Sequence, residues 1–323
     1  MLEHYQVDAS ARLLEAICGN MRKAIFGKDR QIQTVVLALV AGGHVLIEDV
    51  PGVGKTSLVS ALAKSIDCGF KRIQFTPDVV PSDITGFSVF NQKKGDFEFR
   101  PGSIMTNLVL VDEINRASAK TQSALLEAME EHQVTVDAKT YELADPFMVL
   151  ATQNPVEQYG TYPLPEAQLD RFIVKLSLGY ADFQSEVQIY GTDRRAKARL
   201  KPVATAQDIV SLRNQSRDVY INPVLLEYIG KIVFATRQSP DLILGASPRA
   251  GIALVDMSRC HALMQGRNYV LPDDVQALAS LVLSHRVMLS REAKAARTAS
   301  SDVVESLVSS VRVPRGELHA TKR

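Results

Sequence analysis

The sequence predicts an α/β protein in which a parallel sheet with helices on both faces precedes a smaller all-α domain. Three observations support this prediction. Between residues 44 and 178, continuous apolar runs typical of buried strands alternate with helical segments. The first of these runs ends in a glycine-rich turn that leads into a helical segment. Beyond residue 182 the apolar periodicity is almost wholly helical. We therefore expect three parts, namely 1–180, 181–291 and a C-terminal tail at 292–323.

The composition is that of an ordinary soluble globular protein. The chain has 323 residues, of which 46% are hydrophobic and 23% charged, enough for about two domains. Its formal net charge of +1 does not indicate a dedicated nucleic-acid binder. Cys18, Cys68 and Cys260 are far apart, so they indicate neither a disulfide framework nor a metal site and fit a reducing compartment. The N-terminus is polar and the longest apolar stretch, 34–42, is too short to span a bilayer, so we expect a cytoplasmic protein.

The most informative stretch is HVLIEDVPGVGKT, residues 44–56. A strand, a glycine-rich turn, a Lys-Thr pair and a helix together describe a phosphate-binding loop, because the turn's N–H groups can point at phosphate oxygens. Lys55 can reach the β- and γ-phosphates, and the Thr56 hydroxyl can bind Mg²⁺. A chance glycine-rich turn is the alternative, and the flanking strand and helix argue against it. The predicted nucleotide-binding residues are Gly52, Val53, Gly54, Lys55, Thr56 and Ser57.

One residue departs from the usual phosphate-loop pattern. That pattern places a glycine at the position occupied here by Asp49. A carboxylate beside a triphosphate would be repelled by it. We therefore expect the Asp49 side chain to turn away from the phosphates.

Two adjacent carboxylates follow the apolar run at 108–111, which predicts a strand buried on both faces. Asp112 and Glu113 would then lie at the carboxyl edge of the sheet, where ligands bind in open α/β folds. Asp112 would hold Mg²⁺ through water, and Glu113 would polarise the attacking water. An ordinary strand that ends in acidic residues is the alternative, and the preceding phosphate loop argues against it.

A further buried strand, 146–152, delivers Asn154 to the same edge. Asn154 can orient a water near a γ-phosphate, or it can simply cap the turn before Pro155. Residues 25–26 can pack on an adenine ring, although helix–helix packing explains them equally well. Ser247 is expected to cap the N-terminus of a helix that begins with Pro248.

Two β-hairpins are predicted, around residues 87–100 and 133–145. A basic cluster opens the all-α domain. We interpret it as a solvated face, with contact to an anion or to nucleic acid as the alternative. Its members are Arg194, Arg195, Lys197, Arg199 and Lys201.

Five motifs occur in a characteristic order: GKT (54–56), VDEINRA (111–117), ATQNP (151–155), LPEAQLDRF (164–172) and GASPR (245–249). With these motifs the chain closely resembles the MoxR family of AAA+ ATPases over residues 10–290. The resemblance implies an AAA+ nucleotide-binding domain followed by a small all-α lid domain. It also implies that the two hairpins are the helix-2 and pre-sensor-1 insertions of this AAA+ branch.

The resemblance assigns roles to individual residues. Residues 52–56 match the Walker A loop, and Asp112 and Glu113 match Walker B. Asn154 matches sensor 1. Arg171 matches the arginine finger, which reaches the nucleotide of a neighbouring subunit, and Arg249 matches sensor 2 from the lid. Without the resemblance, each arginine has a simpler interpretation. Arg171 can belong to an Asp-Arg pair at a helix end, and Arg249 can be an ordinary surface residue at the start of a helix.

The resemblance also implies a function and partners. Members of the family use ATP and Mg²⁺, usually form hexameric rings, and often work with proteins bearing a von Willebrand factor A domain. Many mature or activate metalloenzymes and other complexes. We therefore expect an ATP-driven ring chaperone that remodels a client protein. A DNA-stimulated motor or loader is one alternative, against which the near-neutral charge argues. A nucleotide-gated scaffold is another, against which the complete Walker B and sensor set argues.

Overall fold

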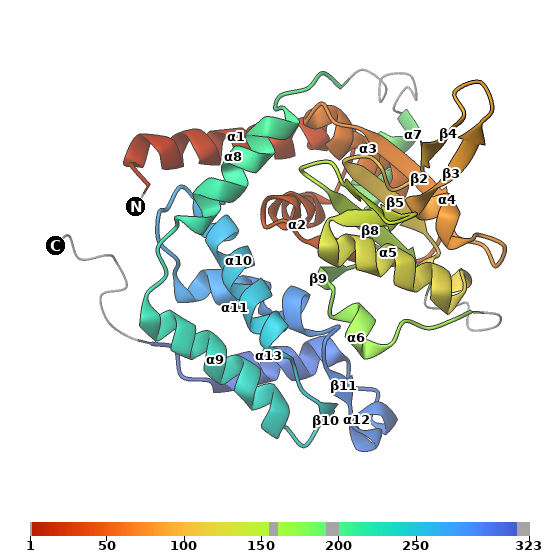
Figure 1. Cartoon of the computed structure of the whole chain (residues 1–323). Coiled ribbons are helices and arrows are strands. Elements are labelled where there is room, and N and C mark those ends of the chain that lie inside the picture. The colour runs from red at the N-terminus through yellow and green to blue at the C-terminus, as the bar shows by residue number, and fades with distance from the viewer. Residues whose placement is uncertain (1, 155–160, 192–199, 315–323) are drawn as a thin grey trace.

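The computed structural model of the chain describes residues 2–154, 161–191 and 200–314 (Figure 1). Its centre is a five-stranded sheet in the order β2-β5-β8-β1-β9. All neighbouring strands in this sheet pair in parallel, so the predicted α/β class is confirmed. The strands are β1 (His44–Glu48), β2 (Phe70–Gln74), β5 (Leu108–Asp112), β8 (Met148–Gln153) and β9 (Phe172–Leu176).

Both faces of this sheet are covered. Along β1, Val45 and Ile47 join one apolar core with the N-terminal helices, and Leu46 joins a second core with α5 on the other face. Strands buried on both faces explain why their sequences are continuously apolar instead of alternating. The helices of this domain are α1 (His4–Arg22), α2 (Asp29–Val40), α3 (Lys55–Ser65), α4 (Pro81–Thr85), α5 (Ala119–Glu131) and α6 (Glu166–Leu169), with a 3₁₀ turn, η1 (Ile114–Arg116).

Two antiparallel hairpins project from this domain, as predicted. The first pairs β3 (Gly86–Asn91) with β4 (Asp96–Pro101), and the second pairs β6 (Gln133–Val136) with β7 (Lys139–Glu142). They meet where Phe99 stacks on Tyr141, with ring centroids 3.8 Å apart. This contact joins two hairpins that lie far apart in the sequence.

The described residues from 200 to 314 form the predominantly helical lid, which also contains the two-stranded sheet β10-β11. Helix α13 packs against α9 and α11, with Val304 and Val308 in the core, so part of the predicted tail packs with the lid. The lid elements and the helix leading to them are α7 (Phe183–Gly191), α8 (Ala206–Arg217), α9 (Pro223–Gln238), β10 (Leu242–Leu244), α10 (Pro248–Met264), α11 (Pro272–Leu283), β11 (Met288–Leu289), α12 (Arg291–Ala295) and α13 (Ser300–Ser310). Of the predicted basic cluster, only Lys201 lies within the described residues.

The lid is fastened to the sheet at the start of β9. The buried Arg286 guanidinium donates to the carboxylate of Asp170 at 2.8 Å and to the carbonyl of Phe172 at 2.7 Å. His285 also bonds the Phe172 carbonyl, at 2.8 Å, and burial lowers its pKa well below the ordinary value. Ser247 occupies the N-cap position of α10, but its hydroxyl accepts no bond from a helix N–H and instead donates to Asp170 at 2.8 Å. The predicted N-cap position of Ser247 and the start of the helix at Pro248 are therefore confirmed, but the capping bond of the side chain is absent, because the hydroxyl is oriented toward Asp170.

Within the described residues, no helix combines the length and the apolar character needed to cross a bilayer.

Candidate nucleotide-binding site

The glycine-rich loop connects the carboxyl end of β1 to the first turn of α3. Gly52 and Gly54 have φ angles of 88° and 98°, in the region that favours glycine. Lys55 is the first residue of α3, and its ammonium donates to the carbonyls of Asp49 at 3.0 Å and Val50 at 3.3 Å. The loop thus presents the N-terminus of a helix together with a cation, which is an arrangement suited to phosphate.

The Asp49 side chain points toward the residues that follow β9, the edge strand beside β1. Its Oδ2 accepts hydrogen bonds from the backbone N–H groups of Leu178 and Gly179, the latter at 3.1 Å, and from the Ser177 hydroxyl at 3.2 Å. Asp49 does not line the cleft described next. The carboxylate therefore points away from the phosphate-binding face, as expected, and joins the loop to the residues that follow β9.

A cleft of about 320 Å³ lies at the carboxyl edge of the sheet. It brings the loop together with the ends of β2, β5 and β8, which are far apart in sequence. Most of the predicted site residues line it, and Val53 lines an adjoining pocket instead. Those in the cleft are Gly52, Gly54, Lys55, Thr56, Ser57, Asp112, Glu113 and Asn154.

Asp112 is buried and held by two groups. Arg72 of β2 places its Nε 2.6 Å from Oδ2, and the Thr152 hydroxyl donates to Oδ1 at 3.2 Å. The Thr56 hydroxyl lines the same cleft. A carboxylate and a hydroxyl are oxygen ligands of the kind that Mg²⁺ prefers, so the residues present fit this ion.

Glu113 adopts a left-handed backbone conformation with a φ of 57°, which is uncommon for a residue other than glycine. Its N–H donates to the Thr152 hydroxyl at 3.0 Å. Its carboxylate accepts from Gln74 Nε2 at 2.7 Å and lies 3.1 Å from Arg116 Nε. These three contacts stabilise the unusual conformation and fix the carboxylate at the mouth of the cleft.

Sequence reasoning missed Arg72, Gln74, Thr152 and Arg116. Arg72 and Gln74 stand two residues apart on β2, so they share one face of that strand. Their partners are Asp112, the last residue of β5, and Glu113, which follows it, and β5 pairs with β2 in the register Gln74–Asp112. The alternating pattern of β2 could have predicted that Arg72 and Gln74 lie on the same face of the strand. The local sequence does not predict that β5 is the strand beside it.

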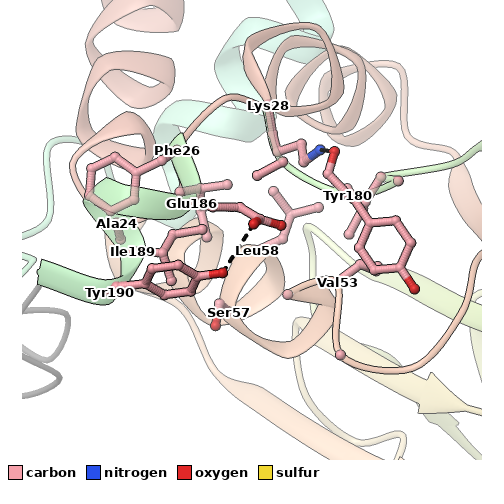
Figure 2. A pocket seen from close by; sticks show the side chains of 16 residues that line it. Ala24, Phe26, Lys28, Val53, Ser57, Leu58, Tyr180, Glu186, Ile189 and Tyr190 are labelled. Carbon is pink, nitrogen blue, oxygen red and sulfur yellow. Dashed lines mark hydrogen bonds between the residues drawn. The ribbon is translucent and has the colours of Figure 1, made fainter. Parts of the chain in front are cut away.

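A second cavity of about 300 Å³ continues from the loop and shares Gly52, Gly54 and Ser57 with the cleft. Figure 2 shows Phe26, Ile189 and Tyr190 along one side of it and Tyr180 across from them. Lys28 closes one end by donating to the Tyr180 carbonyl at 2.7 Å. These walls are largely apolar and aromatic, as a planar base requires.

Residues 25–26 therefore line the cavity, in agreement with the adenine interpretation, although Ile25 also packs against the core. The sequence did not predict the contribution of α7. This helix supplies Glu186, Ile189 and Tyr190 to the cavity, and the Tyr190 hydroxyl donates to Glu186 at 3.0 Å.

Arg171 and Arg249 do not join the cleft of their own chain. Both line a separate cavity that also contains Gly42 and Gly43, the residues before β1. The loop with Lys55 follows the other end of that strand. A five-residue parallel strand is about 16 Å long, so the two arginines lie about a strand length from the glycine-rich loop of their own chain.

Comparisons with known proteins agree with this geometry. The profile of the "ATPase family associated with various cellular activities (AAA)" matches residues 44–174, and that of the "AAA lid domain" matches residues 234–307. A putative ATPase from Cytophaga hutchinsonii superposes with a TM-score of 0.89 at 38% identity, covering 96% of this chain and 98% of that one. Fold and site thus define an AAA ATPase with a helical lid.

Full-length relatives make the family more specific. Chaperone MoxR1 of Mycobacterium tuberculosis is 37% identical over 316 residues, which cover 95% of this chain and 84% of that protein. The uncharacterized protein YeaC of Bacillus subtilis is 52% identical over 313 residues, which cover 96% of this chain and 97% of that protein. The chain belongs to the MoxR family of AAA+ ATPases, as its motifs indicated, and is an ATPase.

Proposed function

We propose that this ATPase works as a ring, most simply a hexamer, in which each active site is completed by the neighbouring subunit. The observation behind this proposal is the position of Arg171 and Arg249 at the amino end of β1, a strand length away from Lys55 at the carboxyl end. Phosphoryl transfer needs positive charge beside the transferred group. The two guanidiniums can supply it only to a nucleotide bound by another copy.

Each residue then has one task. The N–H groups of residues 52–56 and the Lys55 ammonium bind the phosphates. Glu113 accepts the proton of the attacking water, and Asn154 orients that water toward the γ-phosphorus. Arg171 and Arg249 of the neighbouring copy neutralise the charge that develops on the γ-phosphate oxygens.

Mg²⁺ fits the oxygen ligands at the floor of the cleft. The Thr56 hydroxyl would hold it directly, and the Asp112 carboxylate would hold it through water. When bound there, the ion supplies positive charge to the β- and γ-phosphates. Arg72, which pairs with Asp112, would have to release that carboxylate or share it.

The proposed biological role is that of a cytoplasmic chaperone. A relative named Chaperone MoxR1 covers almost the whole chain, and a subunit-shared site couples hydrolysis to motion between subunits. We propose that this motion remodels a client protein or metalloenzyme complex, with a von Willebrand factor A domain protein as partner.

The shared site is tested by mixing two inactive variants. Glu113→Gln should bind ATP without hydrolysing it, and Arg171→Ala should bind ATP with normal affinity but turn over slowly. In mixed rings, the intact arginine of the first variant meets the intact Glu113 of the second, so turnover should partly return. Mixed rings that form, as shown by differently tagged subunits, yet stay inactive at every ratio would rule out the shared site.

The partner is tested by capture on Glu113→Gln rings held in the ATP state, with Lys55→Ala as the matched control that cannot hold ATP. Recovery of a protein with a von Willebrand factor A domain on the first variant alone supports the chaperone role. ATPase activity that rises on addition of duplex DNA, and falls steeply with salt, would favour a nucleic-acid motor instead.

A further inference from the structure

Helix α7 carries an apolar stripe that faces solvent. Phe183, Val187 and Tyr190 are spaced so that they share one face of the helix, and they are 81%, 50% and 77% exposed. Ser185 is the buried residue of this helix. An apolar helix face is normally buried against a partner, so the α7 stripe indicates a docking element.

The lid carries an apolar groove of about 570 Å³ between α9 and α10. Ile229, Val233 and Phe234 line it from α9, and Ile252 and Val255 line it from α10. Phe234 and Ile252 are 54% and 62% exposed. The groove is therefore an open apolar surface beside the helix that bears Arg249.

The α7 stripe and the groove cannot meet within one subunit. Figure 1 shows α7 near α3 at the upper right of the molecule and α9 in the lid at the lower left. The stripe lies beside the second cavity of about 300 Å³, which we assign to the adenine base and call the adenine cavity, because Ile189 and Tyr190 line it. The groove lies beside the arginines, because Ile252 and Asp256 also line the cavity of Arg171 and Arg249.

We propose that α7 of one subunit docks into the α9–α10 groove of the next subunit. This inference rests on the proposed function, which brings the arginine face of one copy against the nucleotide cleft of another. The same approach brings the neighbour's α7 to the groove. Such a head-to-tail contact joins two different surfaces, as a ring of identical subunits requires.

Size and charge agree with this occupant. The nine residues of α7 span about 14 Å, and the groove-lining part of α10, residues 248–259, spans about 18 Å, so the groove is long enough for the helix. The groove contains two arginines, Arg237 and Arg259, and one acid, Asp256. Of the two arginines, Arg259 has a buried Nε without a hydrogen-bond partner among the described residues. Helix α7 carries negative charge from Glu186 and, just before it, from Asp182, although both carboxylates also accept hydrogen bonds within this segment, from Tyr190 and Ser185 respectively.

This contact gives the ring a way to sense nucleotide. The helix that the groove would hold is also a wall of the adenine cavity, so docking orders the cavity and a bound nucleotide orders the docking element. By linkage, ATP should tighten assembly by the same factor by which assembly tightens ATP binding.

Cysteine cross-linking between copies tests the contact. Val187→Cys and Ile252→Cys are prepared separately, each in a Glu113→Gln background, and mixed with ATP under mild oxidation. A disulfide-linked dimer should form in the mixture and not in either preparation alone. As matched control, Ser306→Cys, which is exposed on α13 and does not line the groove, should give no dimer with Val187→Cys.

Two surface variants provide a second readout. Phe183→Asp and Phe234→Asp each place a charge in the apolar contact and should require at least ten-fold more protein for half-maximal ATPase, without a change in thermal unfolding. The docking model would be overturned if no cross-link formed and both Asp variants assembled normally. If activity still returned in the mixture of Glu113→Gln and Arg171→Ala, the shared site would remain supported. Absence of restored activity in rings that do cross-link would instead refute the shared site alone.

Discussion

Arg171 and Arg249 share one carboxylate. Arg171 Nε lies 2.9 Å from Glu130 Oε2, and the Arg249 guanidinium donates to Glu130 Oε1. The arginines come from different domains, one after α6 and the other in the lid helix α10, while Glu130 belongs to α5. A single acid on the sheet domain thus fixes the distance between the two cations proposed to act on a neighbour's nucleotide.

Replacing Glu130 should therefore disturb catalysis and not nucleotide binding. In Glu130→Ala the two guanidiniums repel each other and lose their common position, so we expect turnover at saturating ATP to fall about ten-fold. ATP affinity should stay unchanged, because Glu130 lines neither the cleft nor the adenine cavity. Glu131→Ala is the matched control on the same helix. A Glu130→Ala enzyme with a normal rate and a weakened ATP affinity would contradict this role.

Asp49 should matter for stability and for nucleotide affinity together. Asp49→Ala leaves the N–H groups of Leu178 and Gly179 without their acceptor, which should lower the free energy of unfolding by about 2–3 kcal/mol. Because both residues line the adenine cavity, ATP should also bind more weakly. Ser177→Ala, which removes only a hydroxyl donor, should cost under about 1 kcal/mol. Urea unfolding and ATP titration measure both effects, and tighter ATP binding by Asp49→Ala would show that its charge faces the phosphates after all.

Arg72 should compete with Mg²⁺ for Asp112. The guanidinium is half exposed, so its pairing with the carboxylate is modest in free energy. We expect Arg72→Ala to lower the Mg²⁺ concentration needed for half-maximal binding of a fluorescent ATP analogue by about 3-fold. The measurement uses the Glu113→Gln background, so hydrolysis does not enter. Lys71→Ala, on the other face of β2, should have no effect. A higher Mg²⁺ requirement in Arg72→Ala would mean that Arg72 supports the metal site.

His44 should make stability depend on pH. Burial lowers the pKa of His44 from 6.5 to about 4, and its ring donates to the Met129 carbonyl and accepts from the Val149 N–H. Between these two pKa values the unfolded chain binds a proton that the folded chain does not. The contribution of His44 is therefore complete above pH 6.5 and declines as the pH falls toward 4, by about 3 kcal/mol in all.

Urea unfolding at several pH values between 7.5 and 4.5 checks this dependence. His44→Gln can keep a donor and an acceptor but cannot titrate, so its stability should fall less on acidification than that of the wild type. His4→Gln, on the exposed surface of α1, serves as the control histidine. Parallel pH profiles for the wild type and His44→Gln would show that the buried ring does not set the slope.

Much of the site was predictable because its residues directly follow the ends of strands, and local sequence patterns mark those ends. The loop before Lys55 and the acids after β5 each stand where a strand ends, and parallel strands deliver their carboxyl ends to one edge. The contacts of Arg72 and Gln74 were not predictable in this way, since they depend on β2 pairing with β5 and not with β1. The Ser247 hydroxyl failed as a cap for a related reason, because Asp170 is nearby only in the folded chain.

The sequence alone determined that the chain is an α/β ATPase of the MoxR family with a helical lid, since apolar periodicity and turn residues act over short distances. The tertiary structure alone decided which groups meet. It placed Arg171 and Arg249 on Glu130, a strand length from Lys55, and left the apolar stripe of α7 facing outward. Strand order and domain docking set these relationships through contacts between residues remote in the chain, and no local pattern of residues encodes such contacts.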